Sequence, residues 1–136
     1  MTLREQLIRD EGWRTKPYRD SAGILTIGCG RNLESTGLSQ DEIDYLLAND
    51  IRRAQEGVAI ALPWSGNLDE ARRGVLENMA FNLGVRGLLQ FRKMLTACAA
   101  QDWETASAEM LDSMWAKQVG ERAVRLARQM REGSWQ

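Results

Sequence analysis

Glu11, Asp20 and Thr26 lie close together in the N-terminal part of the chain, and their types suit the hydrolysis of a glycosidic bond. Two carboxylates in contrasting surroundings can serve as the general acid and the general base of that reaction. The acid has to keep its proton, which partial burial favours, whereas the base has to stay ionised, which polar surroundings favour. We expect Glu11 at the end of an amphipathic helix and Asp20 in a β-turn, with the Thr26 hydroxyl holding a water. Because the chain has 19 acidic residues, residue types alone leave other such trios open.

The absence of histidine narrows the chemistry that is available. It excludes Ser-His-Asp and Cys-His nucleophile systems and every histidine metal site, and Cys29 and Cys98 match no metal-binding spacing. We therefore expect no metal and no cofactor. Both thiols are expected to be free and buried, with Cys29 filling a small space inside its turn. Acid–base work is left to carboxylates or, less often, to Lys, Tyr or Cys.

The composition is that of one globular domain, with 136 residues of which 43% are apolar and 27% charged. No apolar run approaches the roughly 20 residues that span a bilayer, and the N-terminus lacks the apolar stretch of a secretory signal, so we expect synthesis in a cytoplasm. Residues 1–70 carry 8 basic and 12 acidic side chains, whereas residues 71–136 carry 10 and 7. The excess of basic side chains in residues 71–136 is consistent with two interpretations: binding to an anionic partner, or a solvated surface. The acidic half and the lack of a recognisable module argue against nucleic acid.

The elements that position the N-terminal trio follow from capping and residue pattern. Thr2 and Glu5 form a capping-box pattern, which predicts a short helix that ends near Glu11, before a glycine. Residues 16–30 contain a Ser-Ala-Gly turn and a β-branched apolar run. They predict a hairpin or a small three-stranded sheet, the only β structure expected in the chain.

From Ser39 onward helical spacing dominates the sequence. Ser39 and Glu42 form a second capping box, which opens a helix of about 20 residues that stops before Pro63. A helix capped by Asp69 is expected to close at Gly84. Further helices are predicted over residues 88–100, 103–111, 114–118 and 121–132. The fold class is therefore α+β and mostly helical.

Three N-terminal segments carry a resemblance to a known family: Asp10-Glu11-Gly12, Tyr18-Arg19-Asp20 with Gly23, and Thr26-Ile27-Gly28-Cys29-Gly30. The spacing of Glu, eight residues, Asp, five residues and Thr resembles the signature of the phage-type lysozymes (glycoside hydrolase family 24), the endolysins related to the T-even bacteriophage enzyme. Downstream, the run from Asn78 to Gly84 is similar to the family's central core helix. The similarity covers almost the whole chain, except that the segment after Leu33 is shorter.

The resemblance implies a single lysozyme-like domain over residues 1–136, with an N-terminal lobe (1–38), a linking helix (39–62) and a C-terminal helical lobe (63–136). It implies a muramidase that hydrolyses the β-1,4 bond between N-acetylmuramic acid and N-acetylglucosamine in peptidoglycan and so lyses bacteria. Glu11 would be the general acid and Asp20 the base, with Thr26 positioning the water. The family's association with inversion requires a carboxylate separation of roughly 6.5–9.5 Å.

The resemblance also implies substrate-binding residues: Asn32, Leu33, Phe81, Asn82 and Arg122. Phe81 matches an aromatic that packs against sugar, although a plain core aromatic is an equal alternative. Arg122 matches a basic residue whose charge would hold the catalytic glutamate in place. Asn32 and Leu33 fall where the family's sheet contacts substrate.

Three positions depart from the family pattern. Arg31 stands where the T-even enzyme has a histidine, so an ion pair there would depend less on pH. Met94 and Glu109 replace smaller or neutral polar groups, which puts those positions in doubt as sugar contacts.

Two other functional classes compete with hydrolysis. Arg122, Arg125, Arg128 and Arg131 recur every three residues beside apolar ones, as in a helix that lies on an anionic membrane, or in a C-terminal helix that packs on the core. A chitinase-like enzyme or a lytic transglycosylase is the other alternative, although a base together with a water-holding threonine favours hydrolysis. We expect a monomer without a stable membrane anchor that reaches the wall through a holin-type pore if it is phage-encoded.

Overall fold

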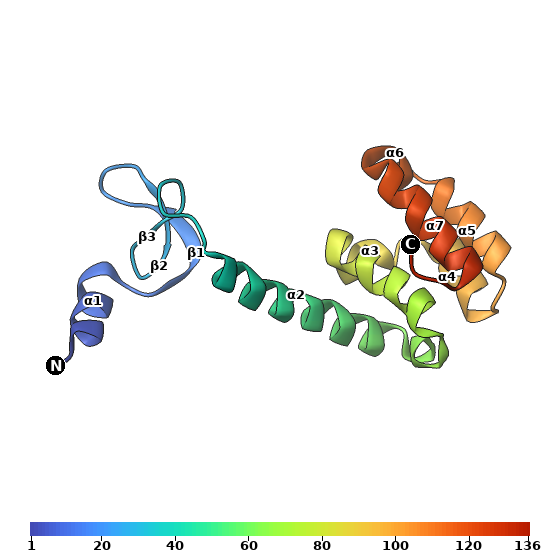
Figure 1. The fold of residues 1–136 in the computed structure, drawn as a ribbon, viewed down its shortest axis with the longest axis horizontal. Coiled ribbons are helices and arrows are strands. Elements are labelled where there is room, and N and C mark those ends of the chain that lie inside the picture. Colours follow the sequence, from blue (N-terminus) through green and yellow to red (C-terminus); the bar gives the residue numbers. More distant parts are fainter. The chain divides into compact units, whose positions relative to one another are not determined.

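The computed structural model describes residues 1–136 as seven α-helices, one short 3-10 helix and one small sheet (Figure 1). This architecture confirms the predicted α+β, mostly helical class. The chain forms two compact units, residues 1–46 and 47–136, and the boundary between them falls inside helix α2 (Gln40–Ala61).

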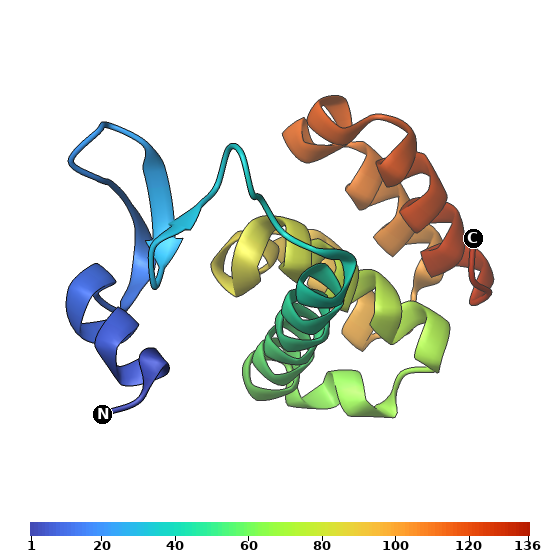
Figure 2. The ribbon, with the colours of Figure 1, turned by 60° about the vertical axis from the view of Figure 1, so that its left-hand side comes forward.

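The first unit contains α1 (Leu3–Glu11) and a three-stranded antiparallel sheet whose strands are adjacent in chain order. The strands are β1 (Arg14–Arg19), β2 (Leu25–Gly28) and β3 (Arg31–Asn32), which follow α1 in Figure 2. Thr26 lies on the central strand, where it pairs with Tyr18 on one side and Asn32 on the other. The register therefore places the threonine in the middle of the sheet.

Local hydrogen bonds fix both ends of this unit as predicted. The Thr2 hydroxyl accepts from the amide of Glu5, whose carboxylate accepts from the amide of Thr2, so the capping box is complete. Ser39 and Glu42 form the same reciprocal pair at the start of α2. These bonds satisfy amides that the first turn of a helix leaves without partners.

The second unit is a helical bundle that contains α2 from Leu47 onward. The elements that follow are a 3-10 helix (Pro63–Asn67), α3 (Glu70–Leu88), α4 (Arg92–Ala99), α5 (Trp103–Leu111), α6 (Met114–Val119) and α7 (Glu121–Glu132). The centre of the bundle is apolar and fully enclosed, and the largest buried side chains are Leu76, Met79, Leu88, Met94, Met110 and Met130. The apolar side of α7 is buried in this core through Ala123, Leu126, Ala127 and Met130. The interpretation of α7 as a core helix with a solvated basic side is thereby confirmed.

A side-chain clamp holds the end of α7 against α3. The guanidinium of Arg72 donates to the carbonyls of Met130 and Arg131 at 2.6 and 2.8 Å, and it stacks over the Trp103 ring at 4.1 Å. These carbonyls belong to the last turn of α7, where carbonyl groups find no hydrogen-bond donor within the helix. The Arg72 side chain therefore acts as a cap. None of the helices is both long and apolar enough to cross a membrane.

Three expectations about this fold were wrong. The helix after Asp69 does not close at Gly84: that glycine adopts φ +76° and kinks the chain, which then continues as helix to Leu88. The next helix accordingly begins at Arg92 instead of residue 88, because Leu88 is fully buried as the end of the preceding helix. Cys29 is exposed in its turn and fills no buried space, whereas Cys98 is buried, and both thiols are free.

Candidate active site

Glu11 is the last residue of α1, and its carboxylate is exposed. The chain leaves the helix at Gly12, whose amide donates to the carbonyl of Ile8. The neighbouring Asp10 is paired with Arg9 at 2.9 Å, but the Glu11 carboxylate makes no hydrogen bond and no ion pair. The first unit therefore does not supply the partial burial that was expected for the acid, and it leaves both oxygens free to meet a substrate.

Asp20 follows β1 and organises the turn to β2. Its Oδ1 accepts hydrogen bonds from the amides of Ala22 and Ile24, each at 2.9 Å, while its own amide donates to the carbonyl of Ile24 at 3.0 Å. A short carboxylate side chain that caps its own turn in this way is held in one rotamer. One oxygen is thus committed to the turn, and Oδ2 is left for other partners.

Thr26 is 3% exposed, and its hydroxyl donates to the carbonyl of Ile24 at 2.7 Å. Because a hydroxyl has one proton and two lone pairs, Oγ1 can then act only as an acceptor towards a further group. The peptide groups of Ile24 therefore fix two candidate side chains at once: its amide holds Asp20 and its carbonyl holds Thr26.

Asn32 and Leu33 lie at the end of β3 in the same unit. Asn32 Oδ1 accepts from the amides of Glu34 and Ser35 at 3.0 and 2.9 Å, so only its NH₂ group remains for other contacts. The amide of Leu33 donates to the carbonyl of Leu25 at 3.0 Å, which adds one hydrogen bond to the sheet beyond β3. The structure thus brings five of the predicted site residues into the first unit: Glu11, Asp20, Thr26, Asn32 and Leu33.

An ion pair ties this sheet to the start of α2. Arg31 Nη1 lies 2.8 Å from Glu42 Oε2 and also donates to the carbonyl of Gly37 at 3.0 Å. The hydrogen bond from Arg31 is the main cause that lowers the pKa of Glu42 to about 2, with further lowering from Ser39. The pairing raises the pKa of Arg31 in turn. Arg31 thus forms an ion pair, and its weaker dependence on pH than that of a histidine pair stays a prediction.

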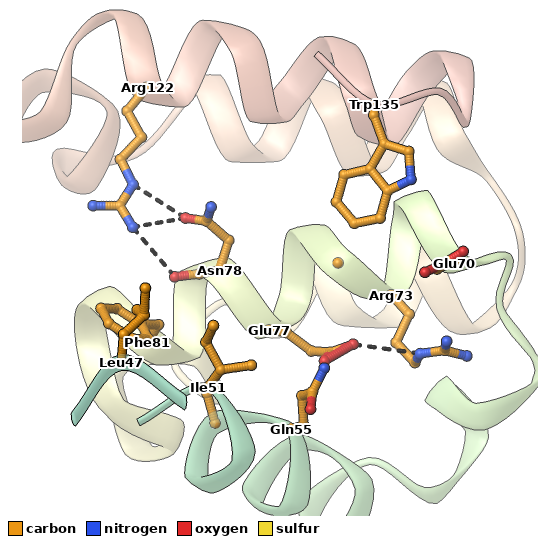
Figure 3. Close-up of a pocket in the computed structure, with 12 residues that line it drawn as sticks. Leu47, Ile51, Gln55, Glu70, Arg73, Glu77, Asn78, Phe81, Arg122 and Trp135 are labelled. Carbon is orange, nitrogen blue, oxygen red and sulfur yellow. Dashed lines mark hydrogen bonds and ion pairs between the residues drawn. The ribbon is translucent and has the colours of Figure 1, made fainter. Parts of the chain in front are cut away.

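The remaining predicted residues belong to the second unit. Phe81 is 46% exposed and lines a cavity of about 430 Å³ together with Leu47, Ile51 and Arg122 (Figure 3). Arg122 Nη2 and Nε donate to Asn78 Oδ1 at 2.7 and 3.1 Å, as the dashed lines in Figure 3 show. The expected contact of Arg122 with Glu11 stays a prediction.

Asn82 has a structural partner. Its Oδ1 accepts from the indole nitrogen of Trp115 at 2.8 Å, and Phe91 meets the same indole edge to face at 5.8 Å. Trp115 is buried, so this bond satisfies a donor that would otherwise be unpaired. The NH₂ group of Asn82 is the part left for a ligand.

Reasoning from the sequence assigned no functional role to three residues that shape these sites: Ile24, Gly30 and Asn78. Ile24 acts only through its peptide groups, so its side chain gave no signal. Asn78 stood inside the recognised core-helix motif but was given no role. Gly30 was the one with a visible signal, because glycines flank Cys29 on both sides in the segment from Thr26 to Gly30.

The structure contains no group of three or more His, Cys, Asp or Glu side chains placed to hold a metal ion.

The Phage lysozyme family model matches residues 9–132. The chain is 33% identical to the pre-baseplate central spike protein Gp5 of Enterobacteria phage T4, over 93% of its own length but only 27% of that protein. It is 26% and 25% identical to probable T4-type lysozymes 1 and 2 of Dictyostelium discoideum, over 92% of its length and 91% of theirs.

Proposed function

The chain belongs to the phage lysozyme family and is a glycoside hydrolase of peptidoglycan, and we propose that Glu11, Asp20 and Thr26 carry out its reaction. The bond cleaved would be the β-1,4 linkage between N-acetylmuramic acid and N-acetylglucosamine. The observation that carries this assignment is the Ile24 peptide, which orients Asp20 and Thr26 together while Glu11 keeps both oxygens free.

The proposed mechanism follows from which atoms remain available. Glu11 donates its proton to the glycosidic oxygen as the bond to the anomeric carbon breaks. A water attacks that carbon from the other face, giving one proton to Asp20 Oδ2. Its second hydrogen is held by a lone pair of Thr26 Oγ1, because the threonine proton is already donated to Ile24. The products are a new reducing end and a free hydroxyl on the leaving sugar.

Substrate binding is the second part of the proposal. The Asn32 NH₂ group and the Leu33 backbone would contact sugar beside the catalytic residues. Phe81 offers an exposed ring for a sugar face, and the Asn82 NH₂ group and the Arg122 guanidinium offer donors. Asn32, Asn82 and Arg122 each already make a structural hydrogen bond, so a substitution would have to preserve that bond to test binding alone.

The access route and assembly state belong to the same proposal. We expect a monomer that acts on the cell wall as an endolysin and that reaches the wall through a pore made by a holin-type partner. Sedimentation of the purified protein at micromolar concentration tests the first expectation. Lysis of a host that expresses the protein with and without such a partner tests the second.

Membrane disruption by α7 is less well supported, since the apolar side of that helix is packed into the core. A lytic transglycosylase would release 1,6-anhydro ends, because the muramic acid hydroxyl replaces water as the nucleophile. The identity of the released ends therefore separates that alternative from hydrolysis.

The experiment that tests the proposal follows reducing ends released from purified peptidoglycan by the parent and by Glu11→Gln and Asp20→Asn. Both changes keep side-chain shape and remove the acid or base, so we expect losses of about 10²-fold or more. Asp10→Asn is the matched control, because Asp10 precedes Glu11 on the same exposed helix end. Circular dichroism checks that all variants are equally folded. Undiminished release by Glu11→Gln would overturn the proposal.

A further inference from the structure

Gly30 lies directly against the Glu11 carboxylate, and we propose that it is a positioning residue that seats this side chain. A Cβ built on Gly30 would stand 2.8 Å from Glu11 Oε2, 3.0 Å from Cδ and 3.2 Å from Cγ. Ordinary carbon contacts lie at 3.5–4.0 Å, so no other residue type leaves room for the carboxylate where it now lies. This inference rests on the proposed role of Glu11 as the acid.

The position of Gly30 matters because no polar group holds the Glu11 side chain. The Glu11 carboxylate has neither a hydrogen bond nor an ion pair, in contrast with the neighbouring Asp10. A hydrogen-bonded partner would hold the carboxylate but would also occupy one of its oxygens. The close approach of Gly30 limits where the carboxylate can lie and leaves both oxygens available to a substrate.

The consequence for substitution is specific. Any side chain at position 30 collides with the far end of a flexible glutamate, which can rotate away at little cost in stability. We therefore expect the collision to displace the Glu11 carboxylate while the fold stays intact. Displacement of a catalytic group by about 1 Å can lower the rate by about 10²-fold.

The same turn supplies a matched control. Gly30 has φ +72° and Gly28 has φ +69°, so an L-residue at either position bears a similar strain in the left-handed region. A Cβ on Gly28 meets nothing within 4 Å, whereas a Cβ on Gly30 meets Glu11. Gly28→Ala thus reproduces the backbone strain of Gly30→Ala without the collision.

The test measures kcat and KM on soluble peptidoglycan fragments for the parent, Gly28→Ala and Gly30→Ala, together with thermal unfolding and crystal structures. We expect the two variants to lose similar stability, with Gly28→Ala within about threefold of the parent kcat and Gly30→Ala about 10²-fold lower at an unchanged KM. The Glu11 carboxylate should move only in Gly30→Ala. If alanine prevents folding, the pair Gly28→Asn and Gly30→Asn is used, because asparagine tolerates the left-handed region.

Equal losses of kcat in the two variants, or an unmoved Glu11 in Gly30→Ala, would overturn the proposal that Gly30 positions the Glu11 carboxylate. Either result would leave the proposed function standing as long as Glu11→Gln is inactive. An active Glu11→Gln would instead reject the proposed function, while the crystal structures would still show whether Gly30 positions the carboxylate.

Discussion

Replacing Thr26 with valine separates the structural role of its hydroxyl from its proposed catalytic one. Valine keeps the branched shape on the central strand and replaces the hydroxyl with a methyl group. The Ile24 carbonyl loses the bond from Thr26 but still accepts from the Asp20 amide at 3.0 Å, so no buried acceptor is left unpaired. The cost is therefore that of one ordinary hydrogen bond, about 0.5–1.5 kcal/mol of unfolding free energy.

The catalytic cost should be much larger. In the proposed mechanism the attacking water donates one hydrogen bond to Asp20 and the other to Thr26 Oγ1. The two bonds together aim its lone pair at the anomeric carbon. With valine, the water can rotate about its remaining hydrogen bond. Loss of one preorganised polar contact in an active site lowers kcat by about 10²–10³-fold, and we expect Thr26→Val to fall in that range.

The assay compares the parent, Thr26→Val and Thr26→Ser by urea unfolding and by release of reducing ends. Serine retains the hydroxyl, so we expect it to recover kcat to within about tenfold of the parent. A Thr26→Val variant with undiminished kcat would refute the role of the threonine in holding the water. A stability loss above about 3 kcal/mol would refute the claim that the Asp20 amide compensates for the lost bond.

Three further predictions concern stability and thiol reactivity. The lowered pKa of Glu42, about 2 against the ordinary 4.5, means that its pairing with Arg31 stabilises the fold fully above pH 4.5 and is lost as pH falls towards 2. The stability difference between the parent and Glu42→Gln should therefore shrink over that window in urea titrations. Arg72→Met should lower the unfolding free energy by about 2–4 kcal/mol, because two charge-assisted bonds to the last carbonyls of α7 are lost; a loss below about 0.5 kcal/mol would contradict this. Burial raises the pKa of Cys98 to about 12, so a thiol reagent should titrate only the exposed Cys29 in the native protein and both thiols in denaturant.

The elements that the sequence predicted well are those whose boundaries are set by neighbouring residues. The capping boxes at Thr2 and Ser39 and the cap at Asp69 bond to groups three residues away, so their partners can be read from the sequence alone. The kink at Gly84 could not be read in that way. A glycine after an apolar run usually ends a helix, but here the buried Leu88 makes it favourable for the chain to resume helical structure.

The exposure of individual side chains was harder to predict than the elements. Cysteine is among the residue types most often buried, and Cys98 follows that tendency in the core. Cys29 does not, because the glycines on both sides of it turn the chain at the surface of a small sheet. Residue type predicts burial only where the surrounding element has an interior to fill.

The candidate site shows a related limit on what residue types reveal. Glu11, Asp20 and Thr26 were found because their side chains carry the proposed chemistry, but their positions depend on main-chain groups of two other residues. Ile24 contributes its amide and carbonyl, which every residue except proline provides, so this role does not require an isoleucine side chain. Gly30 contributes the absence of a side chain, which no other residue provides. Two positions of equal structural importance should therefore tolerate substitution very differently, and only the one that requires glycine leaves a trace in the sequence.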